Sequence, residues 1–152
     1  YADAQAYMTY LFDVLGYKPE QIVLYGESLG SGVAVEMATR YEIGALILEA
    51  PYDSLVNLAS THHPYIPFLK YLMNDKYESI DKIDKITAPK LFLKAGQDMV
   101  IPGKHTDALY QASPPPKEIK VFPEAHHNNF HSFDLDTSVL DFLERNNIIK
   151  NQ

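Results

Sequence analysis

The sequence has no cysteine, few basic residues and no long hydrophobic run. Without cysteine, disulfides, thiolate metal sites and a cysteine nucleophile are excluded, and a reducing compartment such as the cytoplasm is favoured without being fixed. Thirteen Lys and Arg face twenty Asp and Glu, for a formal net charge of −7, which argues against nucleic acid as a partner. No apolar run approaches the ~20 residues that cross a bilayer, so no transmembrane segment is predicted.

The composition that remains is typical of a globular protein, with 46% hydrophobic and 12% aromatic residues. Its length suits one domain with a sizeable core, so we assign residues 1–152 to a single domain. Apolar residues follow helical spacing at 2–15, 28–40, 106–112 and 133–145, and short apolar runs occur at 21–25, 45–50, 90–95 and 118–122. This alternation predicts an α/β fold with a mostly parallel sheet and flanking helices.

A longer insert, residues 53–88, separates the second predicted strand from the third. It contains two prolines and an apolar group made of Phe68, Leu69, Tyr71, Leu72 and Met73. The insert is either a small lid or a set of connecting helices packed on the sheet. The second interpretation is favoured because amphipathic helices usually serve the core of a domain.

Residues 26–30, Gly-Glu-Ser-Leu-Gly, match the Gly-x-Ser-x-Gly pattern of a nucleophile elbow and lie between a predicted strand and a predicted helix. Such a turn strains the backbone of the serine, and Gly26 and Gly30 allow it because neither has a side chain that could clash. Ser28 is the candidate nucleophile, and the backbone N–H of Leu29 is the candidate oxyanion donor. The alternative is a tight turn in which Ser28 only caps the helix.

A serine nucleophile needs a histidine as base and a carboxylate that orients the histidine. Asp98 follows the third predicted strand, at the end where α/β sites collect their residues, and it is the candidate acid. Taken alone, Asp98 would fit better as an Asx-turn or a cap of the helix opened by Pro102, but the serine and histidine motifs that accompany it favour the catalytic acid. Asp53, after the second strand, is the competing acid, but the residues that follow it favour a helix N-cap.

Two adjacent histidines, His126 and His127, follow the fourth predicted strand and complete the order Ser, Asp, His. Adjacent side chains in a loop point in different directions, so one is the base and the other is a solvated or wall residue. The six histidines also raise the question of a metal site, but no His-Glu-x-x-His helix occurs and an adjacent pair is not a zinc spacing. We therefore expect no metal and no cofactor.

Together these motifs resemble the α/β-hydrolase superfamily, and within it the abhydrolase-domain branch of serine hydrolases, which includes depalmitoylating thioesterases and peptidase-like members. The resemblance is carried by residues 22–32, by residues 46–52, where the usual text is Leu-Glu-Ser-Pro-Phe, and by the loop around Asp98. The histidine motif of the branch ends in His-Asn. It therefore assigns the base to His127, and His126 occupies a position that is commonly glycine.

Members of the branch have several strands before the elbow strand, together with a loop that donates the second oxyanion N–H. By this resemblance the chain corresponds to the C-terminal catalytic portion and begins at the helix before the elbow strand. We therefore expect an exposed sheet edge at residues 21–25, relieved by self-association or covered in a longer protein of which this chain is a fragment.

These observations predict a serine hydrolase that cleaves an ester or thioester, or less readily an amide, in a small-molecule or acylated substrate. An acyl-enzyme would form on Ser28, with His127 as base, Asp98 as its orienting acid and Leu29 N–H as oxyanion donor. The alternative is a non-catalytic α/β-hydrolase-like module that binds or interacts, because the N-terminal oxyanion loop is absent.

Overall fold

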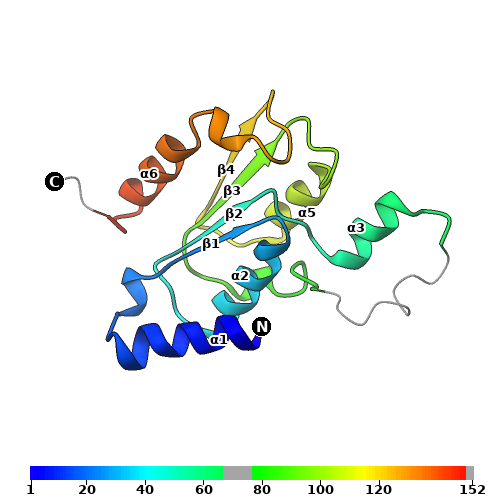
Figure 1. The fold of residues 1–152 in the computed structure, drawn as a ribbon. Helices are drawn as coiled ribbons and strands as arrows, with labels where there is room; N and C mark the ends of the chain where they lie inside the picture. Colours follow the sequence, from blue (N-terminus) through cyan, green and yellow to red (C-terminus); the bar gives the residue numbers. More distant parts are fainter. Residues whose placement is uncertain (67–76, 150–152) are drawn as a thin grey trace.

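The computed structural model describes residues 1–66 and 77–149, and it confirms the predicted parallel sheet with flanking helices (Figure 1). Its four strands lie in the order β1-β2-β3-β4, and all three neighbouring pairs are parallel. The strands are β1 (Val23–Glu27), β2 (Ala45–Glu49), β3 (Lys90–Ala95) and β4 (Lys117–Phe122). Because the strands are parallel, the loops that follow them meet at one edge of the sheet.

The first strand begins two residues later than predicted and continues into the elbow. Pro19–Gln21 form a turn of 3-10 helix, so the chain is not yet extended at residue 21. Pairing with β2 then runs from Val23 opposite Ala45 to Glu27 opposite Glu49. Tertiary pairing, rather than apolar character, therefore decides where this strand ends.

Within residues 1–66 and 77–149, five helices of at least two turns connect and flank the strands: α1 (Ala2–Thr9), α2 (Leu29–Arg40), α3 (Leu55–His62), α5 (Lys104–Ala112) and α6 (Leu135–Arg145). The first predicted helix, residues 2–15, is shorter as an α-helix, because Tyr10–Val14 continue it in a wider π-helical turn. Its apolar stripe is only partly covered. Met8 is buried, but Tyr7 and Leu15 are exposed.

The core lies on both faces of the sheet, and strand β2 shows how the sequence divides between them. All five β2 residues are buried. Leu46 and Leu48 pack on the face covered by α2 and α5, in a cluster that includes Leu109. Ile47, between them, packs on the opposite face with Phe142 of α6. This inner strand is therefore apolar at every position before Glu49, as expected for a parallel strand with helices on both sides.

Strand β1 forms one edge of the sheet within the described residues. A groove of about 840 Å³ runs along it between α1 and α2 and is lined mainly by apolar side chains, among them Met8, Leu11, Val23 and Val33. Self-association through this edge stays a prediction.

The insert begins with α3, and its last part, Ile83 and Ile86, is buried in the core beside α2. The apolar group of the insert, residues 68–73, for which connecting helices were favoured over a lid, lies outside the described residues. Among the residues that the structure describes, no helix is long and apolar enough to cross a membrane.

Candidate active site

Ser28 stands at the junction of β1 and α2. Its backbone has φ 49° and ψ −119°, a conformation that residues other than glycine rarely adopt. The Ser28 N–H donates to the carbonyl of Glu49 on the neighbouring strand at 2.9 Å, and the Ser31 hydroxyl donates to the Ser28 carbonyl at 2.6 Å. Strain of this kind costs about 1–3 kcal/mol and persists only where surrounding contacts enforce it. The turn therefore has the geometry of an elbow. Ser28 takes the N-cap position of α2, but its hydroxyl makes no capping bond.

The two glycines of the motif turn out to be unequal. A Cβ at Gly26 would lie 2.7 Å from the Ala34 Cβ and 2.7 Å from the Ser31 Cα, too close for either to yield. A Cβ at Gly30 would meet nothing within 4 Å. The prediction that both glycines relieve a clash is therefore right for Gly26 and wrong for Gly30, which lines the open groove beside β1.

The structure brings together three of the side chains that the sequence singles out. The Ser28 Oγ lies 3.0 Å from the His127 Nε2, and the His127 Nδ1 lies 2.8 Å from the Asp98 Oδ2. The three residues come from loops after three different strands, β1, β3 and β4. An unbroken path of hydrogen bonds therefore runs from a buried carboxylate to a serine hydroxyl.

Asp98 serves two structural purposes at once. Its Oδ1 accepts the backbone N–H groups of Val100 and Ile101, each at 2.8 Å, which is the Asx-type turn that the sequence offered as an alternative. Its Oδ2 faces His127. With its side chain only 2% exposed, Asp98 is held by its own loop and presents one free oxygen to the histidine.

The N–H of Leu29 belongs to the first residue of α2. The first N–H groups of a helix have no acceptor inside the helix, and the helix dipole favours negative charge near them. This N–H is therefore suited to receive an oxyanion beside Ser28. The Leu29 side chain is 56% exposed, so the approach to this end of α2 is open in the chain.

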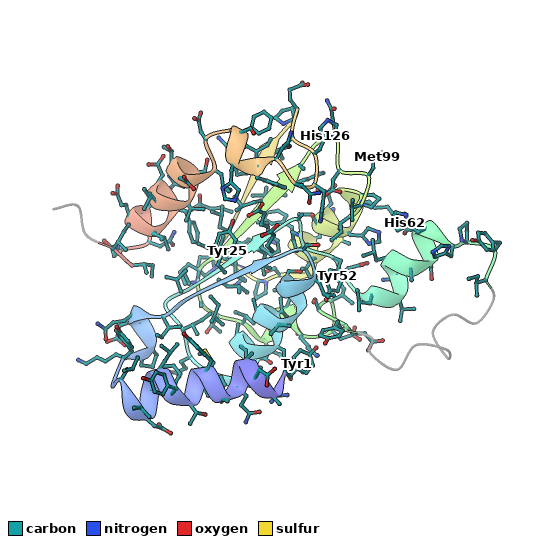
Figure 2. All side chains as sticks on the ribbon, viewed as in Figure 1. Tyr1, Tyr25, Tyr52, His62, Met99 and His126 are labelled. Atoms are coloured by element: carbon teal, nitrogen blue, oxygen red, sulfur yellow. The ribbon has the colours of Figure 1, made fainter. Side chains whose placement is uncertain are left out.

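His126 points away from Ser28. It is exposed, and its Nδ1 lies 3.1 Å from the carbonyl of Gln97. Figure 2 shows His126 at the tip of the loop after β4, near Met99. Met99 belongs to the loop after β3, residues 96–102, which carries Asp98 and is called the acid loop below. Of the adjacent pair, therefore, only His127 reaches the serine.

The competing acid, Asp53, does not cap α3 as predicted. Ser54 is the N-cap, and its hydroxyl accepts the N–H of Asn57 at 3.0 Å. Asp53 instead pairs with His105 of α5, Nδ1 to Oδ1, at 2.8 Å. The Asp53 carboxylate is thus engaged with α5, and the cap is formed by the next residue with a side-chain oxygen, Ser54.

Sequence reasoning missed a second feature beside the elbow, a contact between Tyr25 of β1 and Glu49 of β2. The Tyr25 hydroxyl donates to the Glu49 Oε2. Burial raises the pKa of Glu49, while the bond from Tyr25 and the charges of His131 and His127 act in the opposite direction. No motif reveals this pair, because each partner reads as an ordinary strand residue.

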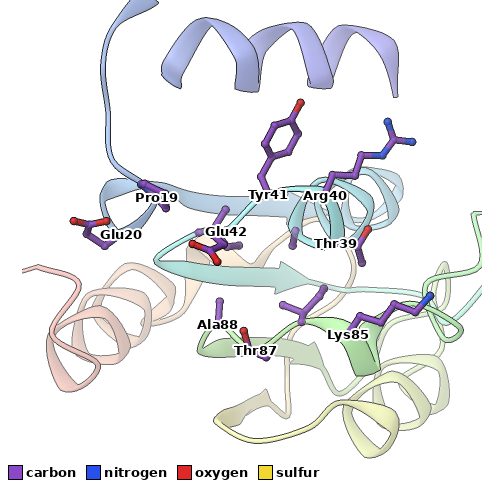
Figure 3. Close-up of a pocket in the computed structure, with 12 residues that line it drawn as sticks. Pro19, Glu20, Thr39, Arg40, Tyr41, Glu42, Lys85, Thr87 and Ala88 are labelled. Carbon is purple, nitrogen blue, oxygen red and sulfur yellow. The ribbon is translucent and has the colours of Figure 1, made fainter. Parts of the chain in front are cut away.

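Neither a metal site nor the cavity at the far end of the sheet competes with this site. Within the described residues, no group of three or more His, Asp or Glu side chains could hold a metal ion. A cavity of about 440 Å³ lies among the segments that precede β1, β2 and β3, the end of the sheet opposite the elbow (Figure 3). Its residues, among them Glu20, Arg40 and Lys85, come from those segments and include none of the residues near Ser28.

Comparison with known proteins found relatives over most of the chain, although no protein-family model matches it. An uncharacterized protein of Mycobacterium tuberculosis is 36% identical over 144 residues, which are 95% of this chain and 50% of that protein. Human alpha/beta hydrolase domain-containing protein 17C is 35% identical over 133 residues, which are 88% of this chain and 39% of that protein. The chain thus spans half or less of the length of these relatives.

Solved structures share the fold at low sequence identity. The chain resembles an acetyl xylan esterase from Paenibacillus sp. R4, with a TM-score of 0.77, 17% identity and coverage of 94% of this chain and 51% of that one. It resembles the esterase domain of a Rhodothermus marinus protein, with a TM-score of 0.71, 20% identity and coverage of 94% and 67%. Its sequence relatives and its fold agree: the chain belongs to the α/β-hydrolase superfamily.

Proposed function

We propose that this chain supplies the catalytic residues of a serine hydrolase that cleaves an ester or thioester, and less readily an amide, through an acyl-enzyme intermediate. The observation that carries the proposal is the path from Asp98 through His127 to Ser28, with contacts of 2.8 Å and 3.0 Å. Its structural neighbours include esterases and a monoacylglycerol lipase, and such chemistry is consistent with theirs.

In this proposal the His127 Nε2 takes the hydroxyl proton of Ser28 while the Ser28 Oγ attacks the carbonyl carbon of the substrate. The Asp98 carboxylate accepts a hydrogen bond from the Nδ1–H, which keeps the Nε2 free to act as base and stabilises the imidazolium that forms. The Leu29 N–H receives the negative charge that develops on the carbonyl oxygen.

His127 then returns the proton to the leaving group, and the acyl group stays on Ser28. A water molecule, deprotonated by the same Nε2, attacks the acyl-enzyme. The His127 Nε2 then gives that proton to the departing Ser28 Oγ, which releases the acid and restores the serine hydroxyl. Esters and thioesters are preferred over amides because alkoxide and thiolate leaving groups need less help from a general acid.

Fluorophosphonate labelling tests the nucleophile. We expect the purified protein to form a covalent adduct that maps by mass spectrometry to the peptide containing Ser28, and we expect Ser28→Ala to abolish it. If wild type and Ser28→Ala are equally unlabelled, the chain is a binding or interaction module instead.

The adjacent histidines provide a matched test of the base. His127→Ala should reduce hydrolysis of a p-nitrophenyl ester by about 10³-fold or more, because Ser28 loses its proton acceptor. His126→Ala removes the neighbouring exposed ring and should leave the rate within about threefold of wild type. Equal losses in the two variants would contradict the assignment of His127.

A further inference from the structure

A second Asp–His pair lies apart from the proposed site. Asp53 stands in the turn between β2 and α3, and His105 lies in the first turn of α5. The His105 Nδ1 is 2.8 Å from the Asp53 Oδ1, and the two side chains are only 3% and 11% exposed. Burying two such side chains costs desolvation free energy unless every polar atom has a hydrogen-bond partner. The partners of Asp53 and His105 therefore show what stabilises the pair.

The partners of Asp53 are all donors. Besides His105, its carboxylate accepts the Ser54 N–H at 2.7 Å and the side-chain amide of Asn57 at 2.8 Å. Three contacts on two oxygens therefore fix the Asp53 carboxylate in place.

The second nitrogen of His105 faces Thr61 of α3, with 3.1 Å between Nε2 and Oγ1. The Thr61 hydroxyl has a single proton and donates it to the carbonyl of Asn57 at 2.9 Å. His105 therefore contacts both Asp53, just before α3, and Thr61, near the end of α3, through its two ring nitrogens.

These contacts tie α3 to α5 near both ends of α3, and α3 in turn reaches the acid loop. The His62 Nε2, at the last residue of α3, donates to the carbonyl of Val100 at 2.8 Å. The N–H of the same Val100 donates to the Asp98 Oδ1. Figure 2 shows His62 on the side of α3 toward the loop that carries Met99. One residue of the acid loop is thus held by α3 on one side and by Asp98 on the other.

We propose that Asp53 and His105 are positioning residues. Their buried hydrogen-bonded pair locks α3 onto α5, and α3 through His62 holds the acid loop in the geometry that Asp98 needs. This inference rests on the proposed roles of Asp98 and His127. It assigns a purpose to an Asp–His pair that the reaction itself does not use.

The pair shares a cavity of about 540 Å³ with polar side chains of α3 and α5. From α3 these are Asn57, Ser60 and Thr61, and from α5 the charged group is Lys104. The pair therefore lies where α3 meets α5, and removing the Asp53 carboxylate would remove the acceptor that joins the two helices.

Hydrogen exchange tests the link to the acid loop. We expect the amides of residues 98–102 to exchange about tenfold faster in both Asp53→Asn and His62→Ala, and the amides of α3 to exchange faster only in Asp53→Asn. The amides of α1 serve as the internal control and should not change. Because His62 lies at the surface, His62→Ala keeps the test valid if Asp53→Asn fails to fold. Unchanged exchange at 98–102 in His62→Ala would refute the positioning role.

The rate of fluorophosphonate labelling at Ser28 should fall by about tenfold in His62→Ala, with kcat of ester hydrolysis reduced more than KM is raised. A rise in KM at constant kcat would instead indicate a substrate contact and overturn the proposal. If the wild type does not label at all, the proposed function fails, whereas the exchange rates still decide on the positioning role.

Discussion

The protein contains two Asp–His pairs with the same 2.8 Å separation between Nδ1 and carboxylate, yet their geometry suits them to opposite tasks. In one pair the far nitrogen of the histidine meets Ser28, and in the other it meets Thr61. Both third residues are hydroxyls at hydrogen-bond distance. The pairs therefore cannot be told apart from the types of residues that compose them.

The difference lies in the backbone beneath each hydroxyl. Thr61 sits in α3, where the carbonyl of Asn57 one turn earlier takes its proton. Ser28 sits in a strained turn with φ 49°, outside any regular element, and its hydroxyl makes no helix-capping bond. A serine in that position can give its proton to His127, whereas Thr61 has already given its proton away. In these two pairs, the difference is thus whether the hydroxyl that the histidine faces donates its proton to a backbone carbonyl.

The largest expected effect comes from replacing the carboxylate of each pair by an amide and comparing the loss of activity. Asp98→Asn should lower kcat of ester hydrolysis by about 10⁴-fold, because the amide no longer holds His127 in the tautomer that accepts a proton. Asp53→Asn should cost only about tenfold, through the position of the acid loop. Steady-state kinetics on both variants check this ratio, with Asp141→Asn on the exposed side of α6 as control. Equal losses in the first two would mean that the roles have been misassigned.

The next largest effect comes from disturbing the strained turn that holds Ser28. Gly26→Ala forces a Cβ to within 2.7 Å of Ala34 and Ser31, so it should destabilise the fold by about 1–3 kcal/mol and displace Ser28, at a cost of about 10²-fold in rate. Gly30→Ala is the matched control. It lies in α2 with open space around it and should raise the free energy of unfolding by up to about 1 kcal/mol. Urea denaturation with an ester assay measures both; a neutral Gly26→Ala would contradict the packing argument.

The smallest effect concerns Glu49, the buried carboxylate next to the first pair. Burial raises the pKa of Glu49 in the folded protein, so the folded state holds this proton more tightly than the unfolded state. Its contribution to stability is full below the unfolded pKa of about 4.3 and is lost as the pH rises through the folded pKa. Glu49→Gln should therefore gain stability relative to wild type as the pH rises from about 4 to about 8.

Urea denaturation across that pH range checks the sign for Glu49→Gln. Glu144→Gln, on the last turn of α6, provides a carboxylate control remote from the elbow in sequence. A difference between wild type and Glu49→Gln that is constant with pH would show that Glu49 does not titrate differently in the folded state.

Local patterns predicted the fold well where neighbours in sequence decide the structure. The third strand was predicted at the bounds it has, Lys90–Ala95, because Pro89 and Gly96 delimit an apolar run. The first strand was misplaced because its end depends on pairing between Glu27 and Glu49, which no local pattern contains. The cap of α3 was assigned to Asp53 rather than Ser54 for the same reason, since the distant His105 takes the Asp53 carboxylate.

The sequence by itself determined the α/β alternation, the elbow at Ser28 and the order of serine, acid and histidine. Hydrophobic periodicity and glycine-containing turns are patterns of a few neighbouring residues, so they can be recognised without the structure. Only the tertiary structure decided which carboxylate meets which histidine, in pairs separated by 29 and 52 residues along the chain. It alone decided which glycine of the elbow is needed and which hydroxyl has a proton to give. These depend on packing across strands and helices, where distance in sequence carries no information about distance in space.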